Sequence, residues 1–210
     1  MEKKILDAEK QLSEPGKYSL TRLLHSAKNL NQLMEDVFEY SQFNSNEKAF
    51  KNTDLNILIK KTIHELKTTI IEHRVAIDID PLPTVSIVPS EINKLFAHLI
   101  TNSIKYAKSD MSPQIKISSE DVSQEELNDV GIHSDSRYIK LTVTDNGTGF
   151  DKDYEKLIFE PFYKLHNNEK HYGSGLGLTA AKKIVKNHRG FIKAVSEPSE
   201  GTVVSIYLPL

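Results

Sequence analysis

The chain has 210 residues, which allows one domain of ordinary size and a smaller helical segment beside it. Its 27 basic and 29 acidic residues leave a net charge of -2, so electrostatics give no reason to expect nucleic acid or an anionic membrane as the main partner. The absence of cysteine excludes disulfides, cysteine-based zinc sites and thiol nucleophiles. No apolar run approaches ~18 residues and no signal-peptide core is present, so we expect no membrane contact by this segment and a cytoplasmic location, alone or as the cytosolic part of a longer protein.

The N-terminal fifth of the chain is predicted to be helical. Residues 2–12 resemble the end of one helix, and residues 17–44 form a second helix whose apolar side chains follow a heptad. Its two core positions are occupied by Leu20, Ala27 and Met34 and by Leu23, Leu30 and Val37. Such a seam needs a partner, and we expect a second copy of the chain; a helix packed on its own domain is the alternative.

A polar, short-sided stretch at 41–52 predicts a boundary between residues 1–46 and a main domain at 50–210. The main domain is predicted to contain a helix at 54–72, strands at 75–79 and 85–88, a helix from Ser90, strands at 115–118 and 139–145, a helix at 176–188, and strands at 191–196 and 202–208. The polar residues 119–137 are expected to form a hairpin connection. Mixed strands and helices predict an α/β layer with the helices on one face.

The first pattern with chemical content lies on the helix after Ser90. Asn102, Lys105 and Tyr106 are spaced i, i+3, i+4 and therefore share one helical face. An amide oxygen suits Mg²⁺, a lysine suits phosphate, and an aromatic ring can pack near a base or a ribose. Taken alone, the pattern is equally compatible with a solvated polar face.

The second pattern, Asp145-Asn-Gly147-Thr-Gly149-Phe150, follows a predicted strand. A carboxylate accepts a hydrogen bond from the exocyclic amine of adenine and repels the carbonyl oxygen that guanine carries at the same place. The two glycines allow positive φ and a close approach of the backbone to a ligand. A tight Asp-Asn-Gly turn in a hairpin is the alternative.

The third pattern, Gly173-Ser-Gly175-Leu-Gly177-Leu178, opens the predicted helix at 176–188. Glycine-rich backbone at a helix N-terminus offers free N–H groups and a favourable dipole to phosphate. The run is not a P-loop, because no Gly-Lys-Ser/Thr follows, and no strand directly precedes it as a dinucleotide fingerprint requires.

In this order and at these intervals, the three patterns resemble the N, G1 and G2 boxes of histidine kinases and their ATPase relatives, which include gyrase, a heat-shock chaperone and mismatch-repair ATPases. The run from Ile158 to Lys164 resembles the F box special to histidine kinases, and Glu200-Gly-Thr202-Val also matches the family. The resemblance covers about residues 20–210 and identifies the chain as a member of the sensor histidine kinases of two-component systems. It implies a Bergerat fold, a two-layer α/β sandwich of the α+β class with a mixed sheet, preceded by part of a dimerisation hairpin.

The resemblance also implies roles for individual residues. Asn102 would hold Mg²⁺ between the phosphates of ATP, and Asn102 and Lys105 would form the catalytic pair. Asp145 would read adenine, with Tyr106 packed near the nucleotide. The remaining nucleotide-binding residues would be Gly147 and Gly149 beside the base, Phe150 in the same box, Thr202 beneath adenine, Lys164 on the phosphates, and Gly173, Ser174, Gly175, Leu176, Gly177 and Leu178 at the end of a lid formed by residues 151–172.

The implied reaction transfers the γ-phosphate of ATP to a histidine on a hairpin helix, in a homodimer, for relay to the receiver domain of a response regulator. Relatives that hydrolyse ATP often use a glutamate just before the metal-binding asparagine, whereas residues 98–101 here contain no carboxylate. This difference favours transfer to a protein side chain. Two alternatives stay open: an ATP-binding regulatory module that transfers no phosphate, and an ATPase of the same superfamily.

The phosphate-accepting histidine is expected to lie upstream of the chain. His64-Glu-Leu-Lys-Thr68 is a near match to the family's acceptor pattern, but it stands only 38 residues before Asn102, where the family has roughly a hundred. His25 lies on the second hairpin helix and lacks an acidic neighbour. We therefore expect neither histidine to be the acceptor.

Overall fold

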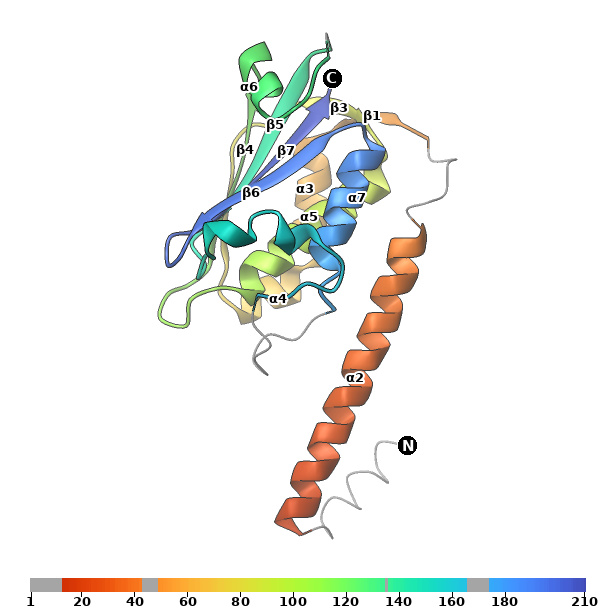
Figure 1. Cartoon of the computed structure of the whole chain (residues 1–210), viewed down its shortest axis with the longest axis vertical. Helices are drawn as coiled ribbons and strands as arrows, with labels where there is room; N and C mark the ends of the chain where they lie inside the picture. Colours follow the sequence, from red (N-terminus) through yellow and green to blue (C-terminus); the bar gives the residue numbers. More distant parts are fainter. Residues whose placement is uncertain (1–12, 43–48, 135, 166–173) are drawn as a thin grey trace.

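The computed structural model describes residues 13–42, 49–134, 136–165 and 174–210 (Figure 1). A long N-terminal helix precedes a domain of seven strands and five α-helices in the described residues. In chain order the elements are α2 (Glu14–Gln42), β1 (Lys51–Asp54), α3 (Leu55–Glu65), α4 (Lys67–Glu72), β2 (Ala76–Ile79), β3 (Thr84–Ile87), α5 (Pro89–Lys105), β4 (Gln114–Asp121), α6 (Gln124–Asp129), β5 (Tyr138–Asp145), η1 (Lys152–Tyr154), η2 (Leu157–Phe159), α7 (Gly177–Asn187), β6 (Phe191–Glu197) and β7 (Gly201–Pro209).

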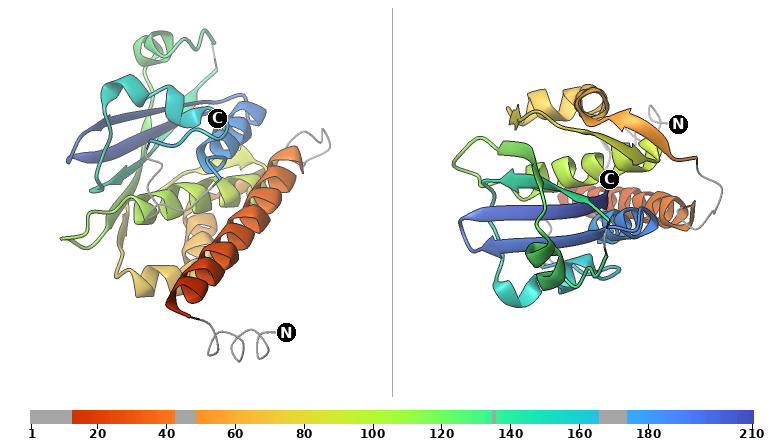
Figure 2. Two further views of the ribbon diagram at one scale, coloured as in Figure 1. Left: turned by 60° about the horizontal axis from the view of Figure 1, so that its bottom comes forward. Right: turned by 90° about the horizontal axis from the view of Figure 1, so that it is seen from above.

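The centre of the domain is a five-stranded mixed sheet in the order β2-β4-β5-β7-β6. The β2–β4 pair is parallel and the other three pairs are antiparallel. Helices α3, α5 and α7 lie on the same side of the sheet (Figure 2), and their apolar side chains form one core with the inward side chains of the strands. The two-layer architecture with a mixed sheet and helices on one face is therefore confirmed.

Helix α5 is the central element of the helical layer. Pro89 stands in its first turn, where the missing N–H costs nothing. Its apolar side chains recur at helical spacing and are almost fully buried, and they are Ile92, Leu95, Phe96, Leu99 and Ile100. The opposite side of the helix is left to carry the polar residues of the first sequence pattern.

A buried histidine joins α5 to α7. His188, which ends α7, is only 2% exposed. Its Nε2 accepts the N–H of Val88 at 3.0 Å, so the proton is on Nδ1, which donates to the carbonyl of Ile184 at 2.8 Å. The buried Glu91 carboxylate lies 3.7 Å from Nδ1. Because Val88 directly precedes α5, the start of one helix is fastened to the end of the other.

Three elements differ from the sequence predictions. Strand β1 was not predicted, because Lys-Asn-Thr-Asp has no apolar alternation, and it pairs with β3 as a separate two-stranded sheet. The helix predicted over 54–72 is interrupted at Leu66, so that it forms α3 and α4. The predicted connection at 119–137 contains helix α6, whose start is capped by the Ser123 hydroxyl accepting the N–H of Glu126.

Helix α6 covers the far side of the sheet and forms a second, smaller core there. Leu127 packs against Tyr138 and Tyr207. The hydroxyl of Tyr207 donates to Glu126 at 2.8 Å, and Lys140 donates to the same carboxylate at 2.9 Å. Burial and the hydrogen bond to Glu126 raise the pKa of Tyr207, so the phenol stays neutral and remains a donor. This polar cluster fixes α6 on strands β5 and β7.

Helix α2 corresponds to the helix predicted over 17–44. Most of its heptad side chains are exposed, including Leu23 at 68%, Leu30 at 58% and Met34 at 63%. The homodimer through this seam stays a prediction. The preceding helix predicted at 2–12 lies outside the described residues, and the division at 46–50 stays a prediction. Within the described residues, no helix has the length and apolarity needed to cross a bilayer.

Candidate functional site

Asp145 is the last residue of β5 and the centre of the candidate site. Its Oδ1 accepts two backbone N–H groups, from Gly147 at 2.9 Å and from Thr202 at 3.2 Å. Thr202 is also its register partner on β7. Its Oδ2 accepts one hydrogen bond, from the Ser103 hydroxyl at 2.9 Å, and a carboxylate oxygen can accept another. Burial raises the pKa of Asp145, while the three hydrogen bonds oppose that rise.

Ser103 is a site residue that the sequence patterns missed. It lies on α5, directly after Asn102, and is 6% exposed. Its hydrogen bond to Oδ2 of Asp145 joins the helical layer to the sheet at the site. Its place between Asn102 and Lys105 could have drawn attention to it, but a hydroxyl in a helix has no signature that distinguishes this role from i−4 back-bonding.

The first sequence pattern lies on the last turns of α5, beside Asp145. In the described part of the chain, the side-chain amide of Asn102 makes no hydrogen bond, so its oxygen is available as a ligand for a hard cation such as Mg²⁺. The Lys105 ammonium lies 4.8 Å from the centre of the Tyr106 ring, within cation–π range. The carbonyl of Tyr106 accepts the N–H of Thr148 at 2.9 Å, which ties the end of α5 to the turn after Asp145.

The turn after Asp145 is held by the β6–β7 hairpin. Gly149 has φ +62°, and a Cβ there would stand 2.0 Å from the carbonyl oxygen of Glu197, so only glycine fits. The N–H of Phe150 donates to the Ser196 hydroxyl at 3.0 Å, and the Phe150 side chain packs on the main core. The contacts of Gly149 and Phe150 within the protein explain why these residues occupy the turn. Their contact with a nucleotide stays a prediction.

The glycine-rich loop leads into α7. The Ser174 hydroxyl accepts the N–H of Leu176 at 3.1 Å, and Gly177 is the first residue of the helix. Gly175 has φ +78°, and a Cβ there would lie 2.8 Å from the carbonyl carbon of Phe162 in the F-box run. The side chains of Leu176 and Leu178 are turned to the interior.

Two further residues predicted to bind the phosphates, Gly173 and Lys164, are not part of the contacts described for the glycine-rich loop. Gly173 lies outside the described residues, as does most of the C-terminal part of the predicted lid. Lys164 is exposed at the end of the described F-box segment. The loop faces α5 at Gly177, where an added Cβ would lie 3.6 Å from Nδ1 of His98. The glycine-rich loop and α5, the helix that carries Asn102, are therefore neighbours.

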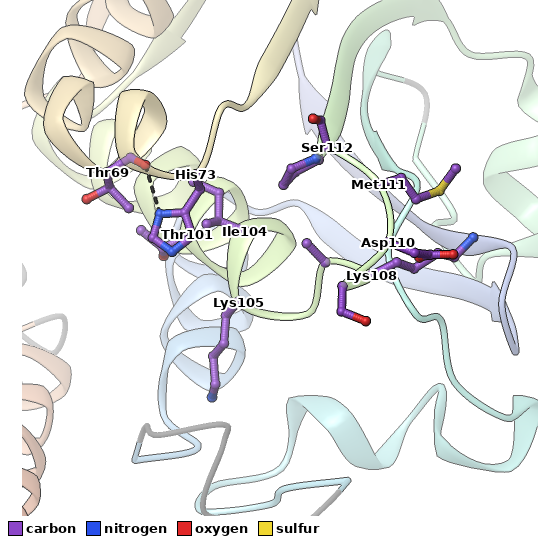
Figure 3. A pocket seen from close by; sticks show the side chains of 12 residues that line it. Thr69, His73, Thr101, Ile104, Lys105, Lys108, Asp110, Met111 and Ser112 are labelled. Atoms are coloured by element: carbon purple, nitrogen blue, oxygen red, sulfur yellow. Dashed lines mark hydrogen bonds between the residues drawn. The ribbon is translucent and has the colours of Figure 1, made fainter.

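A pocket of about 750 Å³ lies between α4, the end of α5 and residues 107–113 (Figure 3). Thr69, His73, Thr101 and Lys105 are among its lining residues. Asp145, Asn102 and the glycine-rich loop do not line it, so it is a neighbour of the candidate site. Lys105 lines the pocket and is also one of the predicted site residues.

The comparisons with known proteins agree with this geometry. The family model described as "Histidine kinase-, DNA gyrase B-, and HSP90-like ATPase" matches residues 87–210, which is more than half of the chain. Cyanobacterial phytochrome A of Nostoc sp. is 32% identical over 95% of the chain and 24% of its own length. Sensor protein RprX of Bacteroides fragilis is 29% identical over 87% of the chain and 34% of its own length. The chain spans about a quarter of the length of the first curated relatives it matches.

Solved structures show the same fold at lower identity. Full-length ShkA in complex with AMPPNP superposes with a TM-score of 0.68 at 19% identity, over 94% of this chain and 39% of that one. Histidine kinase ThkA in complex with the response regulator protein TrrA gives a TM-score of 0.67 at 20% identity, over 98% of this chain and 55% of that one. The chain thus belongs to the family of histidine kinase-, DNA gyrase B- and HSP90-like ATPases, and its domain is an ATP-binding catalytic domain of the histidine kinase type.

Proposed function

We propose that the chain is the catalytic part of a sensor histidine kinase, which transfers the γ-phosphate of ATP to a histidine for relay to a response regulator. The observation that carries the proposal is the placement of Asp145. Its carboxylate is held by three hydrogen bonds at the end of β5 and keeps acceptor capacity on Oδ2. That capacity fits the exocyclic amine of adenine.

The phosphate end of the nucleotide would lie between α5 and the glycine-rich loop. Asn102 would hold Mg²⁺ through its amide oxygen, and the metal when bound supplies positive charge to the phosphate oxygens. Lys105 would add a second positive charge, with Lys164 as a further partner from the F-box segment. The N–H groups at the start of α7, from Leu176 onward, would receive phosphate oxygens, since they stand at a helix N-terminus next to α5.

Transfer breaks the bond between the γ-phosphorus and the bridging oxygen and forms a bond to an imidazole nitrogen, with ADP leaving. The protein's part is to position the two groups and to neutralise charge. Residues 98–101 of α5 contain no carboxylate that could activate water, which supports transfer over hydrolysis.

We further propose that the acceptor is neither His64 nor His25. His64 lies on α3, whose other face is buried in the core of the ATP-binding domain through Leu55, Leu58 and Ile59. A residue fixed to the catalytic domain in this way cannot move toward the γ-phosphate as a separate helix can. The fitting acceptor is a histidine on a helix that pairs with the exposed seam of α2, and that seam also supports a homodimer.

The test supplies the parent chain with Mg²⁺, γ-labelled ATP and a separate histidine-bearing hairpin from a sensor kinase. We expect slow labelling of the hairpin, because a bimolecular encounter lacks most of the proximity gain. The label should be stable to base and lost in acid, and Asn102→Ala should abolish it, whereas His64→Ala and His25→Ala should not.

Strong acid-labile labelling of the chain alone that His64→Ala removes would show that His64 is the acceptor. Tight ATP binding with no labelling of any histidine would favour a regulatory ATP-binding module. Rapid release of free phosphate would favour an ATPase.

A further inference from the structure

Helix α2 touches the ATP-binding domain through Asp36 and Tyr40, on a stripe that is distinct from its exposed seam. Leu33, Asp36 and Tyr40 are spaced i, i+3, i+7 and are all partly buried, whereas Met34 and Val37 beside them are exposed. Tyr40 packs against the main core of the domain. Figures 1 and 2 both show the C-terminal half of α2 passing beside α7. The helix therefore has one face for the domain and another for a partner.

The polar contact on this stripe is made to the glycine-rich loop. The Ser174 hydroxyl donates to the Asp36 carboxylate and accepts the N–H of Leu176 at 3.1 Å. Leu176 directly precedes α7, so its N–H is one of the donors at that helix N-terminus that have no partner within the helix. A carboxylate of α2 thus lies one hydroxyl group away from the positive end of the α7 dipole.

The N–H of Leu176 is among the groups that the proposed function gives to the phosphates of the nucleotide, and the resemblance implies that Ser174 also binds the nucleotide. Both ligands are anionic, and a hydroxyl that donates its single proton to Asp36 cannot donate it to a phosphate oxygen. Two anions at one helix terminus also repel each other, more strongly where water is partly excluded. The Asp36 contact and the bound triphosphate therefore oppose each other.

We propose that Asp36 is a latch that holds the glycine-rich loop against α2, and that the phosphates of a bound nucleotide displace it and release α2 from the domain. The inference rests on the proposed nucleotide site and adds to it a surface of contact, between residues 33–40 of α2 and the entrance of the loop. Release would free the ATP-binding domain to change its position relative to the helix, as delivery of a phosphate to a separate hairpin helix requires. The coupling is reciprocal: whatever undocks α2 tightens nucleotide binding by the same factor.

The first experiment compares Asp36→Asn with the parent chain by calorimetric titration of ATP with Mg²⁺. Asparagine keeps an oxygen that accepts the Ser174 hydroxyl but carries no charge, so the fold and the contact are retained. We expect ATP to bind roughly two- to fivefold tighter, which is the typical range for one charge at a helix terminus. Glu35→Gln is the matched control, because it removes the same charge from the neighbouring exposed position of α2 and should leave the affinity unchanged.

Adenosine separates the latch from a general effect on the domain. It has no phosphates, so its affinity should be the same in the parent and in Asp36→Asn. If Asp36→Asn and Glu35→Gln both bind ATP with the affinity of the parent, the proposed role of Asp36 is wrong, whereas the proposed nucleotide site is unaffected. If the parent and Asp36→Asn bind neither ATP nor adenosine, the proposed function itself has failed.

The second experiment measures the release directly. The chain contains no cysteine, so spin labels can be placed at Asn29→Cys on α2 and Lys186→Cys on α7, both at exposed positions. ATP should lengthen the distance between the labels in the parent, and adenosine should not. Tyr40→Ala, which removes the apolar contact of the same stripe, should give the longer distance without nucleotide. An unchanged distance on saturation with ATP would overturn the release.

Discussion

Replacing Asp145 with asparagine tests the base-reading part of the site with little disturbance of the fold. The asparagine oxygen can keep the hydrogen bonds from the N–H groups of Gly147 and Thr202, at 2.9 and 3.2 Å in the parent. The amide nitrogen would replace Oδ2, and the Ser103 hydroxyl, now 2.9 Å from Oδ2, can turn and accept from it. What changes is the group presented to the ligand, from a charged acceptor to a neutral donor.

The expected loss of ATP affinity follows from that exchange. A hydrogen bond to a charged group contributes about 1.5–3 kcal/mol, so ATP should bind roughly 10- to 150-fold more weakly. The carbonyl oxygen of guanine would meet a donor, so the preference for ATP over GTP should narrow. The thermal stability of Asp145→Asn should not fall along with its affinity for ATP. Because burial raises the pKa of Asp145, the ionised carboxylate destabilises the fold as pH rises through that pKa, and the asparagine variant removes this cost at neutral pH.

The assay is calorimetric titration of both variants with ATP and with GTP, together with thermal unfolding at neutral pH. Asp121→Asn is the matched control, because it makes the same change at an exposed position at the other end of the sheet. Equal affinity of the parent for ATP and GTP, or an unchanged ATP affinity in Asp145→Asn, would refute the assignment of Asp145 to adenine.

Two further predictions concern the seam and the support of Asp145. Leu30→Glu places a charge in the exposed heptad seam and should give monomers in sedimentation equilibrium, while Asn31→Glu should leave association unchanged; a parent chain with no concentration dependence would contradict the dimer. Ser103→Ala removes a hydrogen bond that holds down the pKa of Asp145, so the pH below which ATP affinity is lost should move upward. Titrations at a series of pH values check this, and a superimposable pH profile would show that Ser103 does not act through Asp145.

The sequence predicted those parts of the fold that follow from regular apolar spacing. The buried stripe of α5 and the alternating burial along β6 are examples, because each buries one face and leaves the other more exposed. Strand β1 could not be predicted, since its four residues are polar and it is formed by pairing with β3. Helix α6 is short and polar, and it is stabilised by Leu127 packing on residues far away in the sequence.

Some residues of the candidate site could likewise be predicted from the sequence, and others could not. Asp145 and Asn102 stand in local patterns whose chemistry is visible in the sequence. Ser103 and Asp36 do not, because their roles depend on contacts across 42 and 138 residues of chain. The turn glycine at 149 was found from its pattern, but the structure ties it to Glu197 of the neighbouring hairpin, a partner that no local pattern contains.

The hydrogen bonds of His188 have a mechanical consequence for the two helices that flank the site. They fasten the beginning of α5 to the end of α7, which is the end of the helix pair away from Asn102 and Gly177. The two helices are thus joined at the histidine, and Asn102 and the glycine-rich loop lie toward the opposite end of the pair. Because the histidine fixes one end of the pair, any change in the separation of α5 and α7 would be largest near Asn102 and Gly177, where the nucleotide is proposed to bind.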